Sequence, residues 1–404
     1  MARLHYSMKR CFVTTTSPVF LAVLFTLGHI CIDEYFFFLI QRILSRSVVS
    51  PLKLSRMREL KLFSKDDMKE NNKKEILKNQ YLDDSLEGKS EPTITRFRSL
   101  TICPEVEDNP NMMGSLSQAV LLIDDLSESE VVSINTGLAP GGEWAPDDCK
   151  PRHKVAIIIP YRDRQFHLSR LLYFLIPILK RQKLDFRFIV TEQWGNELFN
   201  KGRIMNAAFR LAESMEVDCV VFHDVDMFPQ DDRNPYSCPQ TPRHMGAFVS
   251  NLGYQLWDND FVGGVLALSM NDYRIVNGYS NLYWGWGGED EDMAKRLKSR
   301  DYRVERPNHD TGKYSMLKHT KRKRSAPKLI HKLFRRAVHR VPTDGVNESD
   351  KWHVIKVELC PLYHHIVVDV GDAPQEWNKG VHEYPFKIPS MLSSVHHFLS
   401  NKIQ

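Results

Sequence analysis

The feature of this sequence that most constrains its fold is an unbroken apolar run, residues 154–160 (KVAIIIP), which is rich in β-branched side chains and ends in proline. A strand that is apolar on both faces has to be covered on both faces, as in a parallel sheet between layers of helices. Helical and strand patterns then alternate along the chain, over residues 166–181, 186–192, 204–215 and 218–223. Pro177 argues against the second half of the first of these helices. The alternation predicts an α/β fold whose mostly parallel sheet has helices on both faces.

The start of the chain has a different composition. Residues 11–32 form an uncharged and largely apolar run after a basic N-terminus, long enough to supply the ~20 residues that span a bilayer. A cleaved signal peptide has a similar layout, but no clear small-x-small cleavage site follows the run. We therefore expect a cytoplasmic tail at 1–10, a single transmembrane signal anchor at 11–32, and a lumenal stem at 33–100 whose polar composition suits a tether. A compact domain at 101–404 is expected to follow.

Charge and cysteine content exclude some classes of function. Lysine and arginine exceed aspartate and glutamate by five, which is too small an excess to indicate a nucleic-acid partner. The compact region has five cysteines and no CxxC pair, so neither a zinc knuckle nor a thioredoxin-like site is expected. In an oxidising compartment these cysteines allow two disulfides and one spare thiol, with the pairing open. Asn347 begins the sequon Asn-Glu-Ser, and its glycosylation would suit lumenal exposure.

Two acidic residues, Asp224 and Asp226, directly follow a buried strand pattern. Ligands of α/β sheets bind at the carboxyl ends of the strands. Two carboxylates there, separated by Val225, suit a divalent cation that in turn holds a diphosphate. A turn that uses aspartate for local hydrogen bonds is the alternative. His319 suits completion of such a metal site, and otherwise belongs to a basic surface run. Met316, three residues earlier, is more often a core residue than a ligand.

The loop after the first strand, residues 160–164 (PYRDR), is expected at the same edge of the sheet. Its arginines suit phosphate oxygens, and Tyr161 suits stacking on a base. A solvated loop is the alternative. The glycine pair at 263–264 lets backbone approach a bound ligand closely, or else belongs to a hairpin.

The stretch 283–293 (YWGWGGEDEDM) combines bulk, flexibility and charge. Its glycines predict a mobile loop, while Trp284 and Trp286 offer flat faces of the kind on which sugar rings stack. The four acids that follow begin a helical pattern, where negative charge meets the helix dipole favourably. That capping role accounts for Glu291 and Asp292. A carboxylate beside a sugar-stacking surface can also accept a proton from an acceptor hydroxyl.

The order of these motifs resembles the sequence of the β-1,4-galactosyltransferase family. The shared segments, between about residues 101 and 370, are CPE, APDDC, KVAIIIPYRDR, FNKGRIMN, FHDVD, PRH, GGVLALS, NGYSNLYWGWGGEDED, RPN, MLKH, DGVN and PLYHHIVVDVG. The family's members are Golgi type II membrane enzymes with the GT-A fold, a nucleotide-binding α/β sheet with a DxD metal site. The resemblance implies transfer of a sugar from a UDP-sugar to GlcNAc, glucose or xylose, with inversion at the anomeric carbon.

The resemblance also implies roles for individual residues. The UDP-sugar would be bound by Pro160, Tyr161, Arg162, Asp163, Arg164, Phe199, Asn200, Lys201, Asp224, Val225, Asp226, Gly264, Trp286 and His319. The acceptor would be bound by Phe261, Tyr283, Gly287, Gly288, Glu289 and Asp290. Glu289 and Asp290 would be catalytic, with Asp290 as the base that deprotonates the acceptor O4, and Mn²⁺ would be held by Asp226, Met316 and His319. Disulfides would join Cys103 to Cys149 and Cys219 to Cys238, leaving Cys360 spare.

Four residues depart from the family's usual pattern: Lys201 stands for arginine, Asp163 for asparagine, Glu291 for aspartate and Phe261 for tyrosine. The bulk of Phe261 argues against an N-acetyl group on the donor, while its missing hydroxyl leaves the donor choice open.

The lead expectation is a membrane-bound Golgi transferase that uses Mn²⁺ and moves galactose from UDP-galactose to GlcNAc or glucose on glycoproteins or glycolipids. The alternatives are UDP-GalNAc as donor, a xylose acceptor in a proteoglycan linker, a non-catalytic membrane lectin, and a metal-dependent phosphohydrolase. A homodimer and a modifier subunit stay open.

Overall fold

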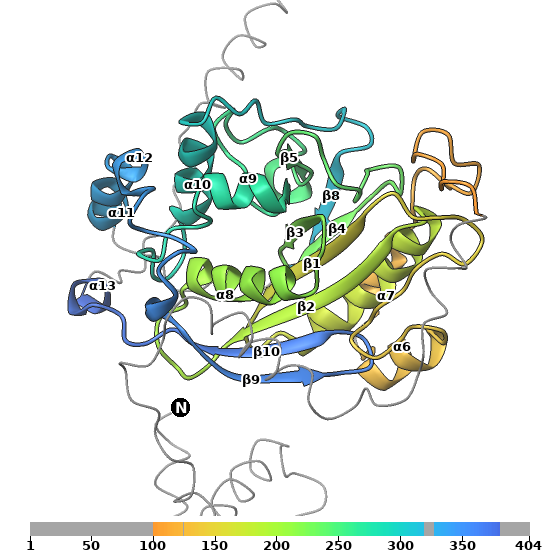
Figure 1. Ribbon diagram of the computed structural model, residues 1–404, viewed down its shortest axis with the longest axis horizontal. Helices are drawn as coiled ribbons and strands as arrows, with labels where there is room; N and C mark the ends of the chain where they lie inside the picture. The colour runs from red at the N-terminus through yellow and green to blue at the C-terminus, as the bar shows by residue number, and fades with distance from the viewer. Residues whose placement is uncertain (1–99, 124, 319–326, 380–404) are drawn as a thin grey trace, which may run out of the picture. The chain divides into compact units, whose positions relative to one another are not determined.

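A seven-stranded sheet is the centre of the part of the chain that this computed structural model describes, residues 100–123, 125–318 and 327–379 (Figure 1). In spatial order its strands are β5 (Arg243–His244), β7 (Val265–Ser269), β3 (Cys219–His223), β1 (Lys154–Tyr161), β2 (Asp185–Gln193), β10 (His364–Asp369) and β9 (His353–Leu359). The predicted strands at 154–160, 186–192 and 218–223 are thus confirmed as β1, β2 and β3, side by side at the centre of the sheet.

The sheet is mixed, which corrects the expectation of a mostly parallel one. β1 is parallel to β2 and β3, and β2 is parallel to β10. At the edges, β7 is antiparallel to β3 and β5, and β9 is antiparallel to β10. Only residues 360–363 connect β9 to β10, and a parallel crossover needs a dozen or more residues. The parallel pattern therefore holds for the centre of the sheet and not for its edges.

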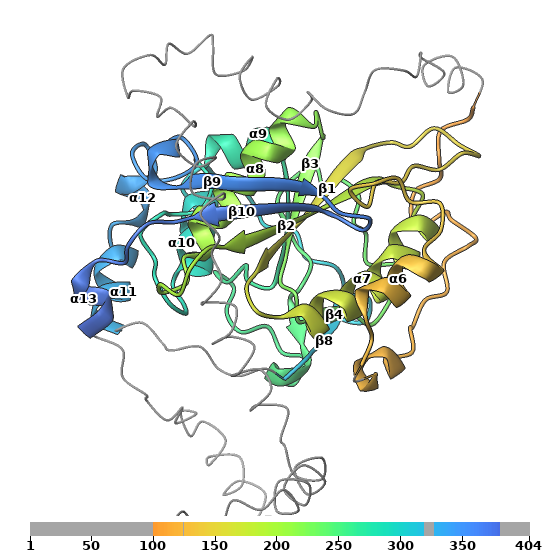
Figure 2. The ribbon, with the colours of Figure 1, turned by 90° about the horizontal axis from the view of Figure 1, so that it is seen from below.

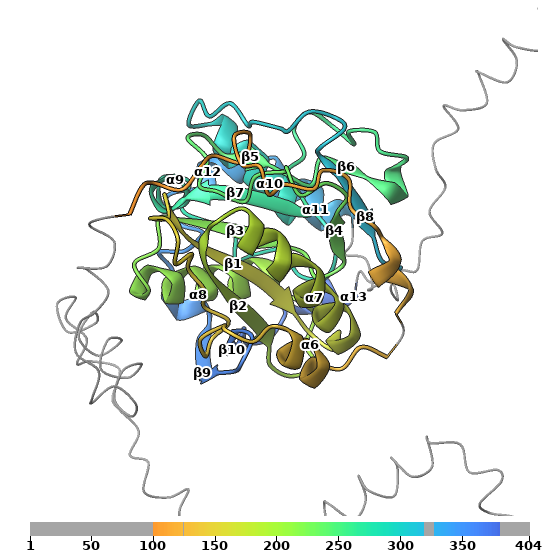
Figure 3. The ribbon, with the colours of Figure 1, turned by 90° about the vertical axis from the view of Figure 1, so that its right-hand side faces the viewer.

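Helices cover both faces of the sheet, as predicted (Figure 3). Helix α7 (Gln165–Arg181) packs on one face in the same apolar cluster as Val155, Ile157 and Ile159 of β1. Helix α8 (Lys201–Ser214) packs on the other face with the alternate residues Ala156 and Ile158. Because successive strand residues point to opposite faces, both sets are buried, and this explains why the run has no polar position.

The expected break at Pro177 does not occur, and α7 continues to Arg181. The residues around this proline, Leu175, Ile176, Ile178 and Leu179, are all buried. Their burial outweighs the hydrogen bond that a proline removes from a helix.

The remaining elements are short. The helices are α6 (Glu128–Ile134), α9 (Met270–Ile275), α10 (Glu289–Lys298), α11 (Pro327–Phe334), α12 (Ala337–Arg340) and α13 (Gln375–Lys379), with 3₁₀ turns at Ala119–Leu122, Ser250–Leu252 and Ser349–Lys351. A second sheet has the order β4 (Met227–Pro229), β8 (Lys313–Met316) and β6 (Phe248–Val249). Figure 2 shows α10, α11 and α12 grouped at one end of the large sheet. These helices and the small sheet border the predicted site.

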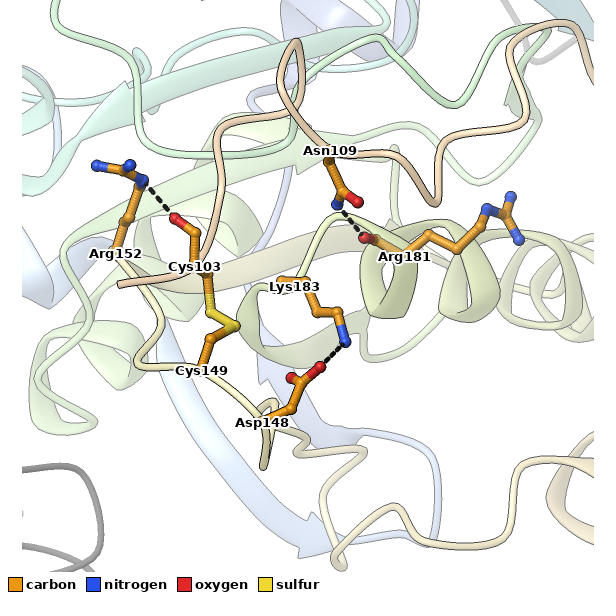
Figure 4. The surroundings of a disulfide bond; sticks show 7 residues. All are labelled: Cys103, Asn109, Asp148, Cys149, Arg152, Arg181 and Lys183. Carbon is orange, nitrogen blue, oxygen red and sulfur yellow. Dashed lines mark hydrogen bonds and ion pairs between the residues drawn. A yellow bond between two sulfur atoms is a disulfide. The ribbon is translucent and has the colours of Figure 1, made fainter. Parts of the chain in front are cut away.

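Both disulfides implied by the family resemblance are present, Cys103–Cys149 and Cys219–Cys238, and Cys360 is a half-buried free thiol. The first bond fastens the segment before β1, as Figure 4 shows. Beside it, Arg152 Nε donates to the Cys103 carbonyl at 2.9 Å, and Lys183 Nζ lies 2.7 Å from Asp148. The N-terminal segment of the described residues is therefore tied covalently and by hydrogen bonds to the sheet and to α7.

No helix among the described residues is long and apolar enough to cross a membrane. The expected tail and anchor, and all of the stem before residue 100, lie outside the described residues. These predictions therefore stay predictions.

Candidate active site

The carboxyl ends of β1 and β3 meet at one edge of the sheet, as the sequence predicts. Residues 162–164 follow β1, and residues 224–226 follow β3. Arg164 Nη1 lies 3.5 Å from Asp226 Oδ2, and both side chains are largely buried. The loop after the first strand and the Asp-Val-Asp segment therefore form one site.

Tyr161 and Asp163, both predicted to bind the nucleotide, differ in their exposure to solvent. Tyr161 is the last residue of β1 and lies in the core, and its hydroxyl donates to Gln165 at 3.2 Å. Its ring is therefore largely covered, which argues against the predicted stacking on a base. Asp163 is exposed with a φ of 54°, a conformation that asparagine and aspartate adopt more readily than other side chains. This explains why either residue fits there.

Lys201 lies among three carboxylates from two distant segments. Its Nζ is 3.0 Å from Asp224 Oδ1, 3.5 Å from Asp290 Oδ1 and 3.8 Å from Glu289 Oε1. The lysine is the first residue of α8, next to Asn200, which caps the helix by accepting from the Arg203 amide. The ammonium group therefore joins the Asp-Val-Asp segment to the predicted catalytic acids.

Burial and mutual repulsion shift the titration of this cluster. Burial raises the pKa of Asp290, and the charge of Asp224 raises it further, while Lys201 opposes the rise. Burial and the neighbouring Asp290 raise the pKa of Glu289 to about 8. For Lys201, burial disfavours the charged amine, but the surrounding carboxylates outweigh it and the pKa is raised. One ammonium is shared by three acids, so the acids bind protons more readily than in water.

Gly263 makes room for the Asp290 carboxylate. A Cβ at Gly263 would lie 2.5 Å from Asp290 Oδ2 and would also overlap the Phe261 ring. The expectation was that the glycine pair lets backbone approach a ligand. The groups that approach Gly263 are instead Asp290, the predicted base, and Phe261. Gly264 has a φ of 83°, and its carbonyl accepts the Asp224 amide at 2.9 Å. The pair thus connects the Asp-Val-Asp segment to the predicted base.

Two of the three predicted metal ligands lie side by side. Met316 ends β8 and pairs with Met227, the residue after Asp226. The Leu317 amide donates to the Asp226 carbonyl at 2.9 Å, which fixes the two segments together. His319 lies outside the described residues, and within those residues no three His, Cys, Asp or Glu side chains gather to hold a metal. A carboxylate is the donor that Mn²⁺ prefers and a thioether is not, so Asp226 is the better fit of the pair.

The two tryptophans of the Trp-Gly stretch have different surroundings. Trp284 is only 1% exposed and lies in the core, with the Arg203 guanidinium over its ring at 4.7 Å. It cannot stack on a sugar, so that interpretation is wrong for Trp284. Trp286 is 51% exposed, in a loop where Gly285, Gly287 and Gly288 all have positive φ. Only Trp286 therefore offers a face to a ligand.

Asp292 does more than cap a helix, and sequence reasoning missed its role. It is fully buried and accepts from Arg296 at 2.6 Å, from Arg340 at 2.5 Å and from the Tyr283 hydroxyl at 2.9 Å. Arg296 and Arg340 also bind Asp344. The spacing of Asp292 and Arg296 was visible in the sequence, but Arg340 lies 48 residues away from Asp292, and Asp344, which shares both arginines, lies further along the chain. Tyr283, predicted to contact the acceptor, is buried in this network.

The mixed α/β sheet, with carboxylates at its strand ends and a second acidic segment facing them, defines a glycosyltransferase of the GT-A-like class. Two family models match, one for the N-terminal region of glycosyl transferase group 7 over residues 103–239 and one for the N-terminal domain of galactosyltransferase over residues 243–320. The chain is 41% identical over 281 residues to β-1,4-galactosyltransferase 1 of Bos taurus, covering 69% of this chain and 68% of that one. It is 40% identical over 269 residues to β-1,4-galactosyltransferase 5 of Sus scrofa, covering 66% and 68%.

A solved structure gives the same assignment. The catalytic domain of Drosophila β1,4-galactosyltransferase 7, in complex with xylobiose, superposes with a TM-score of 0.50 at 26% identity, covering 56% of this chain and 98% of that one. The chain belongs to the β-1,4-galactosyltransferase family.

Proposed function

We propose that this protein transfers galactose from UDP-galactose to the 4-hydroxyl of a terminal GlcNAc or glucose on glycoproteins or glycolipids, with inversion. One observation carries the proposal: Asp290 and Asp224, from distant segments of the chain, both lie next to Lys201, and Asp290 follows the loop that carries the exposed Trp286. A donor held at Asp224 would place its sugar within reach of the Asp290 carboxylate. The relatives named above, which are β-1,4-galactosyltransferases, support the same reaction.

The described residues account for the proton transfer. Asp290 takes the proton of the attacking hydroxyl, and its raised pKa makes it a stronger base than an ordinary carboxylate. The gap at Gly263 lets the carboxylate sit against the backbone with little water around it. Lys201 favours the ionised form of Asp290 and, with Arg164, offers positive charge to the departing UDP.

Asp226, Met316 and His319 are the residues proposed to hold Mn²⁺. When bound there, the ion would offset negative charge on the diphosphate leaving group. Substitution of Asp226 is the main test of this metal site. We expect Asp226→Asn to lose Mn²⁺ binding, measured by electron paramagnetic resonance of the free ion, with an unchanged unfolding midpoint.

Galactose is proposed over N-acetylgalactosamine because of Phe261. Its ring lies against Gly263 and, edge to face, against His244 at 5.9 Å between ring centroids. This packing leaves the ring next to Asp290 and fills space that an N-acetyl group would need. Initial rates with UDP-galactose and UDP-GalNAc on a GlcNAc acceptor test the choice. A higher rate with UDP-GalNAc would overturn it.

Two other classes of function give different results in the same assay. A lectin on this scaffold would bind GlcNAc without releasing UDP, and a phosphohydrolase would release UDP without an acceptor. The proposed transferase releases UDP at a rate that depends on acceptor concentration. A xylose acceptor, as in a proteoglycan linker, is separated from GlcNAc and glucose by including all three sugars.

We also propose residence in the Golgi membrane as a single-pass type II protein with its catalytic domain in the lumen. The apolar run at 11–32 supports the anchor, and the two disulfides support an oxidising compartment. Asn347 is exposed, although its Nδ2 donates to the Pro342 carbonyl at 3.1 Å. Protease protection in sealed Golgi vesicles tests the orientation, since degradation of the catalytic domain without detergent would contradict it.

A further inference from the structure

Helix α11 has one apolar face, and that face is packed against the acceptor side of the site. Leu329, Ile330 and Leu333 pack on the large apolar cluster. A Cβ at Gly288 would lie 2.9 Å from Ile330 Cγ2, so the helix touches the loop that carries Trp286. Lys295 of α10 donates to the Phe334 carbonyl at 3.3 Å. Helix α11 is therefore fixed beside the position proposed for the acceptor sugar.

The exposed side of α11, together with the turn that follows it at 335–336, is strongly basic. Lys328, Lys332, Arg335 and Arg336 are all exposed. No aspartate or glutamate occurs between residues 327 and 340. None of the four cations forms an ion pair with any carboxylate in the described ranges. We call these four residues the α11 basic face.

The α11 basic face differs from the other basic residue of this segment. Arg340, one turn later, forms ion pairs with Asp292 and Asp344 in the buried network. The four exposed cations have no such role, and like charges so close together repel one another. A solvated surface is the ordinary reason for exposed lysine, but a cluster without any acid creates a local positive potential. That potential lies on the exposed side of the segment whose apolar face contacts the loop at Gly288.

We propose that the α11 basic face binds carboxylate or sulfate groups on the acceptor glycan, beyond its terminal sugar. The inference rests on the proposed function, since it needs a glycan acceptor beside Trp286. Arginine and lysine are the side chains that bind such anions, and Arg335 and Arg336 can do so with paired N–H groups. An anionic lipid surface would suit the same charges. We choose the acceptor because α11 borders the loop of Trp286, so that a glycan leaving the site beside α11 can pass over the exposed side of this helix. The substrate class this adds is an acidic oligosaccharide that ends in a neutral sugar.

Two pentasaccharides of equal length test the proposal. Chitopentaose is neutral, while a hyaluronan pentasaccharide with GlcNAc at its non-reducing end has the same terminal sugar and two carboxylates further along. In low salt we expect the charged acceptor to have a KM about fivefold below the neutral one, and the difference to shrink at 0.5 M NaCl because exposed charges are screened. Equilibrium binding of both oligosaccharides, measured calorimetrically, gives a readout that does not need turnover.

The test variant is the triple substitution K332Q/R335Q/R336Q. It changes one exposed position of α11, where glutamine is a good helix former, and the two exposed positions of the turn after it. It should remove the advantage of the charged acceptor and leave chitopentaose unchanged. The matched control, K150Q/R300Q/K356Q, removes three exposed cations from other elements and should keep the advantage.

Several results would overturn the proposal. One is equal binding of both oligosaccharides to the unaltered protein, and another is an advantage that survives the triple substitution. A third is salt-sensitive binding of phosphatidylserine vesicles through these residues with no preference between the acceptors, which would assign the face to lipid. Failure of the proposed function is a separate outcome, because it would appear as binding without transfer to either acceptor.

Discussion

Two acids in the first turn of α10, only two residues apart, lie in opposite electrostatic situations. Asp290 shares the single ammonium of Lys201 with Glu289 and Asp224. Asp292 faces two guanidinium groups, from Arg296 and Arg340, and is fully buried. The first region has more negative than positive charge, while the second matches each carboxylate with arginine.

The difference shows how one short acidic stretch can serve both chemistry and folding. A carboxylate crowded by others has a raised pKa and gains from taking a proton, which is what a general base does. A carboxylate between two arginines is held in place and keeps its charge paired. Asp292 also joins α10 to α12 through Arg340, so it fixes the helix on which Asp290 stands.

The largest expected effect comes from the crowded region. Asp290→Asn should lower turnover by about 10²–10⁴-fold, because the acceptor hydroxyl loses its base. Donor binding should be retained, which a UDP-galactose titration followed by tryptophan fluorescence would measure. Turnover within a few fold of the unaltered enzyme would exclude Asp290 as the base.

Glu291→Gln is the matched control for that change. Glu291 lies between the two regions, half-buried in the same turn. Burial and the charge of Asp290 raise its pKa, but it forms no ion pair with Lys201, Arg296 or Arg340. We expect its turnover to stay within about twofold. A loss as large as that of Asp290→Asn would mean that negative charge in general, rather than one carboxylate, is required.

The next effect comes from the paired region and falls on stability. Asp292→Asn leaves Arg296 and Arg340 short of a buried partner, so we expect a loss of about 3 kcal/mol or more in the free energy of unfolding. Urea denaturation followed by circular dichroism measures it. An unchanged midpoint would show that the network is not a stabilising unit.

A smaller effect is expected on the pH profile. Lys201→Gln removes the positive charge beside Asp290, so the pKa of this base should rise further, by about one pH unit or more. Asp290 must be ionised to act, so the acid limb of the kcat/KM profile should move to higher pH. Lys201→Arg, which keeps the charge, should leave the limb in place. A profile that does not move in Lys201→Gln would contradict the proposed coupling.

The smallest effect concerns the stability of the crowded region itself. The pKa of Glu289 is raised from 4.5 to about 8, so the folded protein binds this proton more tightly than the unfolded chain. Its contribution to stability is present below pH 4.5 and is lost as pH rises towards 8. Glutamine does not ionise, so the Glu289→Gln variant should not lose this stability as pH rises. Its melting temperature, relative to that of the unaltered protein, should therefore increase by about 2–4 °C between pH 5 and pH 8. A difference that is constant across this range would rule out the titration.

The central strands and the candidate site were predictable because their signals are local. The run at 154–160 and the acids after β3 can be recognised within a few residues. The antiparallel edges were not predictable, since the direction of β7 depends on the path of about forty residues after β3. Trp284 and Trp286 lie on either side of Gly285 in the sequence, and only the folded chain, with Arg203 over the Trp284 ring, separates the buried tryptophan from the exposed one.

Local sequence signals also could not show that Asp290 and Asp292 of α10 have different surroundings. By local pattern both suit the helix dipole, and only the family resemblance separated Asp290, as the predicted base, from Asp292, as a capping residue. Their partners come from Lys201 on one side and from Arg340 and Asp344 on the other. Only the folded chain brings those residues to them.

The most direct test of the division between the two regions is the unfolding midpoint of Asp290→Asn, measured on the preparation used for turnover. The raised pKa of Asp290 means that its buried charge opposes folding at neutral pH, so a neutral amide should leave the midpoint equal or higher while turnover collapses. A midpoint that falls together with turnover, as expected for Asp292→Asn, would contradict the account and make Asp290 a structural residue.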